Sequence, residues 1–318
     1  MIGAQSMAIN QELAFVFPGQ GSQTLGMLAD LAEQYAVIQE TFAEASAVLG
    51  YDLWALAQEG PQETMNMTER TQPLLLTASV AIWRVWQAQG GDMPAVMAGH
   101  SLGEWSALVC ADVVAFTDAV KLVQLRGKYM QEAVPAGVGS MAAIIGLDDA
   151  AIIDACAEAA QGEEVSAVNF NSPGQVVIAG HVGAIERAIE LCKAKGAKKA
   201  MALAVSAPLH SALLKPAADR LAVDLENVTF SAPTTPIIHN VNAKTEVDPS
   251  VIKQLMIEQI YHPVLWVDCV NHIVSGGAKS AIECGPGKVL TGLIKRINRE
   301  LVSATIDKPE ALSTALAQ

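Results

Sequence analysis

The chain alternates short apolar runs with longer segments in which apolar positions recur every three or four residues. The short runs are bounded by glycine, proline or asparagine, which is typical of buried strands; they lie at 13–17, 94–98, 237–240 and 280–284. Helical spacing is found at 72–89, where Pro73 would lie in the first turn, at 102–110, and from about 288 onward. Strands that alternate with helices predict an α/β fold.

The middle of the chain has a different order of elements. We expect a strand at 140–145, a helix at 148–160, strands at 165–169 and 175–179, a helix at 182–195 and a strand at 200–205. The order β-α-β-β-α-β is that of a ferredoxin-like unit. The sequence therefore predicts an inserted ferredoxin-like domain at 134–205 within a larger α/β domain made from 11–133 and 206–318. Residues 1–10 match no element and are expected to be a flexible leader.

Composition and charge narrow the class of protein. Hydrophobic residues make up 51% of the chain, yet no apolar stretch approaches the roughly 18 residues of a membrane span. The first residues lack the basic start and apolar core of a secretory signal. Five scattered cysteines without a Cys-x-x-Cys pair argue against a disulfide framework or a zinc site and predict a cytoplasmic protein. The formal net charge of −13 disfavours a nucleic-acid partner.

A candidate nucleophile lies between a predicted strand and a predicted helix. The segment Gly99-His100-Ser101-Leu102-Gly103 has the G-x-S-x-G pattern of a nucleophile elbow, in which a sharp turn exposes the serine oxygen. The Leu102 N–H is the first expected donor to an oxyanion. The glycine-rich loop at 17–23 is the best candidate for the second donor, although the loop alone would read as a plain turn.

The base is expected to be a histidine, and the chain has six of them. His210 lies at a predicted strand–helix junction after the inserted domain, where active-site side chains are often presented. This favours His210 over the other five without deciding the choice. His100 adjoins Ser101 and is expected to point away from its side chain and to support the turn.

Arg126 occupies an apolar stripe of a predicted helix. Its neighbours at helical spacing are Ala119, Leu122, Val123 and Met130. A guanidinium on such a stripe needs an anionic partner. That partner is either an internal carboxylate or a carboxylate of the substrate, and the sequence leaves both open.

These segments together resemble the malonyl-coenzyme A:acyl carrier protein transacylases of fatty acid synthesis. The motifs that carry the resemblance are Phe-Pro-Gly-Gln-Gly-Ser-Gln at 17–23, Gly-His-Ser-Leu-Gly-Glu at 99–104, Gln-Leu-Arg-Gly at 124–127, Asn-Ser-Pro-Gly-Gln at 171–175, Pro-Leu-His at 208–210 and Gly-Pro-Gly-Lys-Val-Leu at 285–290. The family's fold is an α/β-hydrolase-like core with a ferredoxin-like insertion, which agrees with the division of the chain made above.

The resemblance implies a role for individual residues. Ser101 would be the nucleophile and His210 its base, with Gln259 helping to orient the histidine and Arg126 holding the malonyl carboxylate. The N–H groups of Gln20 and Leu102 would form the oxyanion hole. The implied reaction is a ping-pong transfer of malonyl between coenzyme A and the phosphopantetheine thiol of acyl carrier protein, without a metal or other cofactor.

Two basic groups on this acidic chain are candidates for docking the acidic carrier protein, although each taken alone reads as an ordinary solvated helix end. The groups are Lys193, Lys195, Lys198 and Lys199, and Lys288, Lys295, Arg296 and Arg299. We expect a monomer. Two other functions stay open: an α/β-hydrolase-type esterase or thioesterase, whose triad acid would lie between serine and histidine in the chain, and a non-catalytic module that binds carrier protein.

Overall fold

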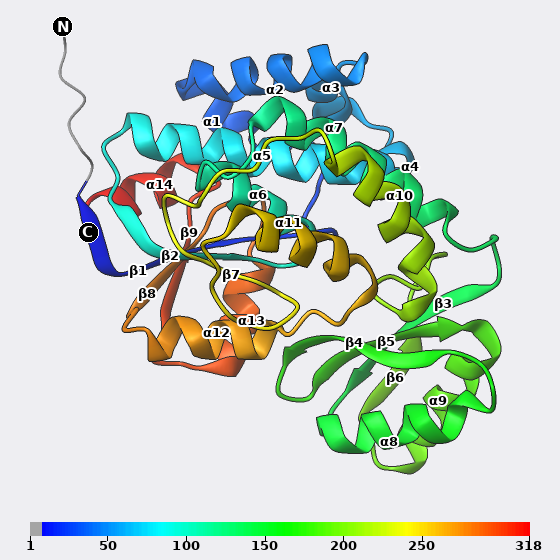
Figure 1. The fold of residues 1–318 in the computed structure, drawn as a ribbon. Helices are drawn as coiled ribbons and strands as arrows, with labels where there is room; N and C mark the ends of the chain where they lie inside the picture. Colours follow the sequence, from blue (N-terminus) through cyan, green and yellow to red (C-terminus); the bar gives the residue numbers. More distant parts are fainter. Residues whose placement is uncertain (1–7) are drawn as a thin grey trace, which may run out of the picture.

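The computed structural model describes residues 8–318 and contains two β-sheets that share no strand (Figure 1). The strands are β1 (Ile9–Phe17), β2 (Met93–Gly99), β3 (Gly139–Ile145), β4 (Val165–Ser172), β5 (Gln175–His181), β6 (Lys199–Ala202), β7 (Ile237–Ile238), β8 (Ser280–Glu283) and β9 (Val302–Thr305). The fold is mixed α/β, with one parallel and one antiparallel sheet.

Helices cover both faces of the parallel sheet and one face of the antiparallel sheet. The α-helices are α1 (Ala29–Gln34), α2 (Ala36–Leu49), α3 (Leu53–Glu59), α4 (Gln62–Met65), α5 (Thr68–Ala88), α6 (Leu102–Cys110), α7 (Phe116–Glu132), α8 (Asp149–Ala160), α9 (Val182–Ala194), α10 (Lys215–Leu225), α11 (Pro249–Glu258), α12 (Trp266–Ser275), α13 (Val289–Ile297) and α14 (Pro309–Leu316). Two 3₁₀ turns, η1 (Ala212–Leu214) and η2 (Gln259–Tyr261), complete the set. Within residues 8–318, no helix has the length and hydropathy needed to cross a bilayer.

The parallel sheet has the strand order β7-β2-β1-β8-β9 and is buried on both faces. Side chains alternate along β1, so that Phe15 and Phe17 pack into the core under α5 and α6 while Ala14 and Val16 pack against α12 and α13. Figure 1 shows the sheet between these two helix layers. Burial on both faces explains why its strands read as unbroken apolar runs rather than as alternating ones.

The carboxyl ends of the parallel strands all meet at one edge of the sheet. Strand β1 leads there into the loop that begins at Pro18, β2 into Ser101 and β7 into His239 and Asn240. In open parallel sheets, ligands bind in the crevice beyond this edge. The topology therefore places the glycine-rich loop, the elbow and the segment after β7 side by side.

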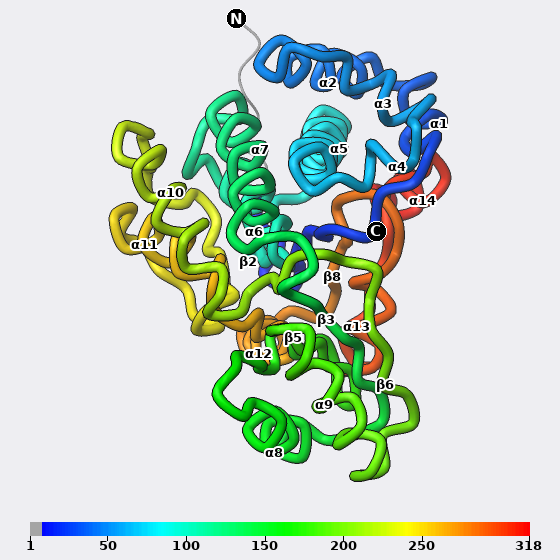
Figure 2. Tube along the Cα trace, turned by 90° about the vertical axis from the view of Figure 1, so that its right-hand side faces the viewer, coloured from blue at the N-terminus to red at the C-terminus, as the bar shows by residue number. Residues whose placement is uncertain are grey.

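The antiparallel sheet has the order β4-β5-β3-β6 and carries α8 and α9 on one face. A separate small core, including Ile144, Ile178 and Ile185, lies between the sheet and these helices. Figure 2 shows this unit below the parallel-sheet part of the molecule, with β3, β6 and α13 close to the junction. An isolated bridge joins Asn169 of β4 to Val264, which ties the two parts together beside the elbow.

The observed elements differ from the expected ones at several ends. Strand β1 begins at Ile9, so residues 9 and 10 of the expected leader belong to the sheet; residues 1–7 lie outside the described residues. Helix α5 begins at Thr68, so Pro73 is inside the helix and not in its first turn. The strand expected at 237–240 ends at Ile238, and the one expected at 200–205 ends at Ala202. After Ala202 the apolar pattern continues although backbone pairing has stopped, whereas after Ile238 the chain continues with the polar residues His239 and Asn240.

Candidate active site

Ser101 lies in a backbone conformation that L-residues rarely adopt, with φ 53° and ψ −111°. Such a conformation costs on the order of 1–3 kcal/mol and persists only where the surroundings hold it. The residue directly precedes α6, so its side chain projects from the turn at the positive end of that helix. The sequence pattern predicted this arrangement, and the structure has it.

The glycines on each side of the serine are required by close backbone packing. A Cβ atom at Gly99 would overlap the backbone carbonyl of Gly103, and one at Gly103 would overlap the carbonyl oxygen of Phe17. A Cβ at Gly19 would press against the carbonyl oxygen of His100. The glycine-rich loop after β1 is thus in direct contact with the elbow, which a plain surface turn would not need.

His210 contacts the serine with one ring nitrogen and the main chain with the other. Its Nε2 lies 2.7 Å from Ser101 Oγ, and its Nδ1 lies 2.7 Å from the carbonyl oxygen of Gln259. Because that carbonyl can only accept, Nδ1 carries the proton and Nε2 is free to accept from the serine hydroxyl. His210 itself has a φ of 63° and is buried, so its position is fixed by the surrounding fold.

The surroundings of His210 favour its neutral form. Burial lowers the pKa of His210 to about 3, and the positive charge of Arg126 acts in the same direction. The hydrogen bond to the Gln259 carbonyl partly opposes the shift. The ring is therefore an unprotonated acceptor throughout the neutral pH range.

Arg126 extends from α7 into the same site, with 1% of its surface exposed. Its Nη1 donates to Gln72 Oε1 at 2.7 Å, and its Nη2 donates to Gln259 Oε1 at 2.8 Å and to Ser101 Oγ at 3.2 Å. Burial lowers the pKa of Arg126 to about 10, and the carboxylate of Glu104 partly offsets this. Within residues 8–318 no carboxylate lies at ion-pair distance from Arg126, so the internal salt bridge considered from the sequence does not form.

Two N–H groups near the elbow have no hydrogen-bond acceptor within residues 8–318. Leu102 is the first residue of α6, so its N–H has no partner within the helix. The N–H of Gln20 has no acceptor in the part of the chain that the structure describes, and its side-chain oxygen accepts from Thr68 Oγ1 at 3.2 Å. Both groups belong to segments that touch at the contact of Gly19 with the elbow.

A cleft of about 510 Å³ gives access to Ser101 and His210. One wall carries the polar residues Gln20, Gln23 and Asn66. The other wall comes from the antiparallel-sheet part and includes Met141, Val177 and Leu203. The cleft can therefore hold a narrow, partly polar chain that ends at the serine.

The structure separates the other candidates from this centre. His100 bonds to Asn171 Oδ1 at 2.7 Å and packs near Trp266, so it supports the turn as expected. Asp148 is one of the acids between Ser101 and His210 in the chain that could have served an esterase triad, and it caps the start of α8. Because the partner of His210 Nδ1 is a main-chain carbonyl, the site lacks the acid of a serine–histidine–acid triad.

The eight basic residues proposed for docking are all exposed, and four of them lie near the β4–β5 turn. Lys295, Arg296 and Arg299 surround an open hollow together with Pro173 of the β4–β5 turn. Lys198 packs beside Gly146, whose N–H donates to Gly174 O of that same turn. Lys193, by contrast, forms a surface ion pair with Glu190.

Two buried residues of the site were not singled out from the sequence: Gln72 and Asn240. Gln72 holds Arg126, and Asn240 bonds to the backbone on both sides of the elbow. The available signal was a polar residue at a buried position, since Gln72 begins an apolar helical run and Asn240 directly follows an apolar strand. Within the described part of the chain, no cluster of three or more histidine, cysteine or acidic side chains could hold a metal ion.

Comparisons with known proteins agree with this geometry. The family model described as "acyl transferase domain" matches residues 14–311. The malonyl CoA-acyl carrier protein transacylase of Salmonella typhimurium is 62% identical over 307 residues, which cover 96% of this chain and 99% of that protein. The corresponding Bacillus subtilis protein is 43% identical and is covered to 96% on both sides.

Solved structures give the same result. An acyl carrier protein S-malonyltransferase from Vibrio cholerae is 62% identical, with a TM-score of 0.94 over 95% of this chain and 99% of that one. A malonyl-transacylase solved in complex with a type II PKS acyl-carrier protein is 59% identical, with a TM-score of 0.95 over 96% and 99% of the two chains. The chain therefore belongs to the acyl transferase family, and within it to the malonyl CoA-acyl carrier protein transacylases.

Proposed function

We propose that the chain transfers malonyl groups from malonyl-coenzyme A to the phosphopantetheine thiol of an acyl carrier protein, with Ser101 as the nucleophile. The observation that carries this proposal is the placement of Arg126 Nη2 3.2 Å from Ser101 Oγ in a buried site where no carboxylate of residues 8–318 lies at ion-pair distance from the guanidinium. A substrate that brings its own carboxylate supplies what the site lacks.

In the first half-reaction, His210 Nε2 takes the proton of the Ser101 hydroxyl as Oγ attacks the thioester carbonyl. The carbonyl oxygen becomes negative and is stabilised by the N–H groups of Gln20 and Leu102. The C–S bond then breaks, the coenzyme A sulfur takes the proton from His210, and a malonyl-serine ester is left.

The second half-reaction runs the same steps with a different thiol. The phosphopantetheine thiol of the carrier protein loses its proton to His210 and attacks the ester carbonyl, after which Ser101 Oγ leaves and recovers the proton. One thioester is consumed and one is formed, so the exchange is close to thermoneutral. Serine, thioester and thiol supply every atom, and the reaction as written uses no cofactor.

The malonyl carboxylate would replace an amide partner of Arg126. The guanidinium presently donates to two glutamine side chains, Gln72 and Gln259, which keep its plane directed at the serine. A carboxylate that binds both Nη groups gains a bidentate, charge-assisted pair in a dry site. Acetyl groups have no atom for this contact.

For the carrier protein we propose docking on the basic surface around the β4–β5 turn, formed by Lys198, Lys199, Lys288, Lys295, Arg296 and Arg299. Lys193 and Lys195 would lie at its margin, since Lys193 is already paired with Glu190. Members of both sequence groups lie near this turn: Lys198, just before β6, packs beside Gly146, which bonds to Gly174, and Lys295 and Arg296 of α13 share a hollow with Pro173. Local positive charge of this kind can steer an acidic partner to a chain of net charge −13.

The fold supports two finer proposals. The residues around the parallel sheet, 11–133 and 206–318, would form an α/β-hydrolase-like catalytic domain, and 134–205 a ferredoxin-like domain inserted into it. The separate core under β3 to β6 supports this division. We also propose that the chain acts as a monomer, because both thioester half-reactions use one cleft and one serine.

The test is to trap the intermediate. Incubation with malonyl-coenzyme A, followed by peptide mass spectrometry, should show malonyl on Ser101 and release of an equal amount of coenzyme A. The Ser101→Ala variant should keep its fold and form no adduct, while Ser106→Ala, a serine on α6 that lies away from the cleft, should be labelled normally. Labelling of Ser101→Ala, or hydrolysis of the adduct in place of transfer to carrier protein, would refute the proposal.

A further inference from the structure

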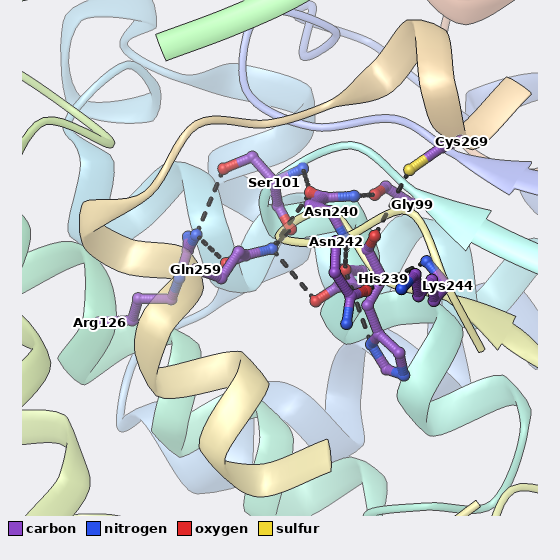
Figure 3. Close-up of polar contacts among 10 residues, drawn as sticks. Gly99, Ser101, Arg126, His239, Asn240, Asn242, Lys244, Gln259 and Cys269 are labelled. Atoms are coloured by element: carbon purple, nitrogen blue, oxygen red, sulfur yellow. Dashed lines mark hydrogen bonds and ion pairs between the residues drawn. The ribbon is translucent and has the colours of Figure 1, made fainter. Parts of the chain in front are cut away.

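Backbone pairing between β2 and β7 stops just before the elbow. The two strands pair at Met97 with Ile237 and at Ala98 with Ile238, and no further rung follows. Beyond these pairs, the side chain of Asn240 makes the bonds to the β2 side of the elbow. Its Nδ2 donates to Gly99 O at 2.7 Å, and its Oδ1 accepts from the Ser101 N–H at 2.8 Å (Figure 3).

These two bonds reproduce the pattern of a parallel sheet. In a parallel ladder, one residue donates to the carbonyl before its partner and accepts from the N–H after it. The Asn240 amide does this on either side of His100, so a side chain adds one rung to the sheet where the main chain has turned away.

The chemistry of the partners fixes which way the amide faces. Gly99 O can only accept and the Ser101 N–H can only donate, so Nδ2 faces Gly99 and Oδ1 faces Ser101. A side chain that can only accept, such as a carboxylate, could make one bond but not the other. The position therefore calls for an amide.

Asn240 is itself held on several sides and is fully buried. Its N–H donates to Glu104 Oε1 at 2.5 Å, and its carbonyl accepts from the Leu265 N–H at 3.1 Å. Gln259 Nε2 donates to Ser101 O at 2.9 Å, so the serine is fixed at its carbonyl as well as at its N–H. Neither side chain depends on a water-exposed contact.

We propose that Asn240 is a positioning residue for the transfer reaction: its side-chain amide holds Ser101 in its unfavourable backbone conformation and thereby aims the hydroxyl at His210 and the Leu102 N–H at the reacting carbonyl. The inference rests on the proposed function, since it assigns Ser101 as the nucleophile. Asn240 acts through the two main-chain bonds and touches no substrate.

The variant that tests this is Asn240→Asp, which keeps the shape of the side chain and removes one donor. At pH 7.5 the introduced carboxylate would face the Gly99 carbonyl oxygen, displace the elbow and slow malonyl-serine formation by about 10²-fold, as a displacement of about 1 Å can do. The matched control is Asn242→Asp. Asn242 is exposed, and its oxygen accepts from the Lys244 N–H at 3.0 Å, a bond that a carboxylate also makes.

Lowering the pH should rescue the variant, which a merely structural role would not predict. Burial and the nearby carboxylate of Glu104 would raise the pKa of the introduced carboxyl group, and a protonated carboxyl can again donate to Gly99 O. The other titratable groups around this position are His239, whose Nδ1 is 3.8 Å from Glu104 Oε1, and Cys269, which donates to His239 O. Arg126 is linked to the position through Gln259, and its positive charge opposes part of this rise. We expect the ratio of variant to wild-type acylation rates to rise at least fivefold between pH 7.5 and 5.5.

The outcomes separate this inference from the proposed function. A wild-type chain that forms no malonyl-serine overturns the proposed function. If the wild type and Asn242→Asp are labelled normally and Asn240→Asp reacts at the same rate, or shows no pH rescue, the inference alone is wrong. If Asn240→Asp does not fold, Asn240→Ala takes its place; a methyl group can make neither bond, and acylation at the wild-type rate would refute the role.

A measurement on the unmodified chain needs no variant. If the Asn240 amide holds the elbow, the backbone N–H of Ser101 should exchange with solvent slowly, at a rate like that of the N–H groups of β1. Exchange of Ser101 at the rate of an exposed loop would overturn the inference. The reagent is heavy water alone, so the result does not depend on a substrate.

Discussion

The two walls of the cleft differ in polarity and in hydrogen bonding. The wall formed by the parallel-sheet part presents Ser101, and Arg126 and Gln259 lie buried behind it, hydrogen-bonded to the serine and to each other. The wall formed by the antiparallel-sheet part presents Met141 and Val177, which are apolar. The same part carries exposed lysines on its outer side.

This difference indicates a division of labour. Groups that need fixed positions come from strand ends and helices whose backbone is tied into the larger core, where small displacements are costly. Groups that guide a flexible arm or attract a partner need only surface and charge, and they lie on the smaller unit and on α13 beside it. Changes on the first wall should therefore alter the chemical step, and changes on the docking surface should alter the encounter with carrier protein.

The largest effect is expected at His210. His210→Ala removes the proton acceptor 2.7 Å from the serine oxygen and should slow serine acylation by about 10²–10⁴-fold. Stopped-flow measurement of coenzyme A release provides the rate. His272→Ala, on α12 and bonded to Ala243 O, is the matched control and should be unchanged. A near-normal rate for His210→Ala would move the base to another residue.

Arg126→Ala should change the substrate preference of the same wall. Loss of one partner of a buried ion pair costs about 3–5 kcal/mol, which is roughly two to three and a half powers of ten in malonyl transfer. The acetyl group has no carboxylate, so the rate of acetyl transfer should be unchanged or higher. The readout is the malonyl-to-acetyl ratio of kcat/KM beside the melting temperature, with the exposed Arg220→Ala as control. Equal loss of both activities would show that Arg126 has a structural role only.

The pH dependence of Ser101 reactivity tests how strongly burial lowers the pKa of His210. The pKa of His210 is lowered to about 3, so the histidine stays neutral from pH 7.5 to 5.5. The rate at which Ser101 reacts with a neutral serine reagent, such as a sulfonyl fluoride, should therefore stay constant over this range. A histidine with an ordinary pKa of about 6.5 would lose about tenfold at pH 5.5. The unfolded chain binds a proton at this position below about pH 6.5 and the folded chain does not, so acidification from 6.5 toward 3 should also lower stability. A tenfold loss of reactivity in a still folded chain would contradict the burial argument.

The smallest effect is expected on the docking surface around the β4–β5 turn. Reversing two charges, as in Lys295→Glu with Arg296→Glu, should raise the KM for carrier protein about three- to tenfold and leave the KM for malonyl-coenzyme A unchanged, because rim charges mainly affect association. The effect should fade as salt is added. Lys121→Glu with Lys279→Glu makes the same change in net charge away from the β4–β5 turn. A similar rise in that control would point to net charge rather than a docking surface.

The sequence predicted most elements that carry the chemistry, and physical reasons explain where it fell short. Helix α6 was predicted to its first and last residue, because a glycine-flanked serine marks its start clearly. The four elements of the antiparallel sheet were found because turn residues separate each apolar run. The end of β7 was misplaced, since the periodicity of side chains does not show where main-chain pairing gives way to a side-chain bond.

The site itself was partly predictable. Ser101, His210 and Arg126 stand out by motif, loop position and a charge on an apolar stripe, and the structure brings His210 and Arg126 each within hydrogen-bond distance of Ser101 Oγ. Gln72 and Asn240 did not stand out, because a buried amide is recognised only when its partners are known. Those partners lie 54 residues away for Gln72 and 139 for Asn240.

The carbonyl that orients His210 belongs to the peptide backbone, and this has a genetic consequence. A triad acid can be lost by a single codon change, whereas every residue that replaces Gln259 keeps a carbonyl oxygen in the chain. A saturation mutational scan would therefore report at position 259 only the loss of the side-chain amide. The orienting role would appear instead at neighbouring positions that fix the course of η2, such as Pro263, where selection acts on the path of the chain.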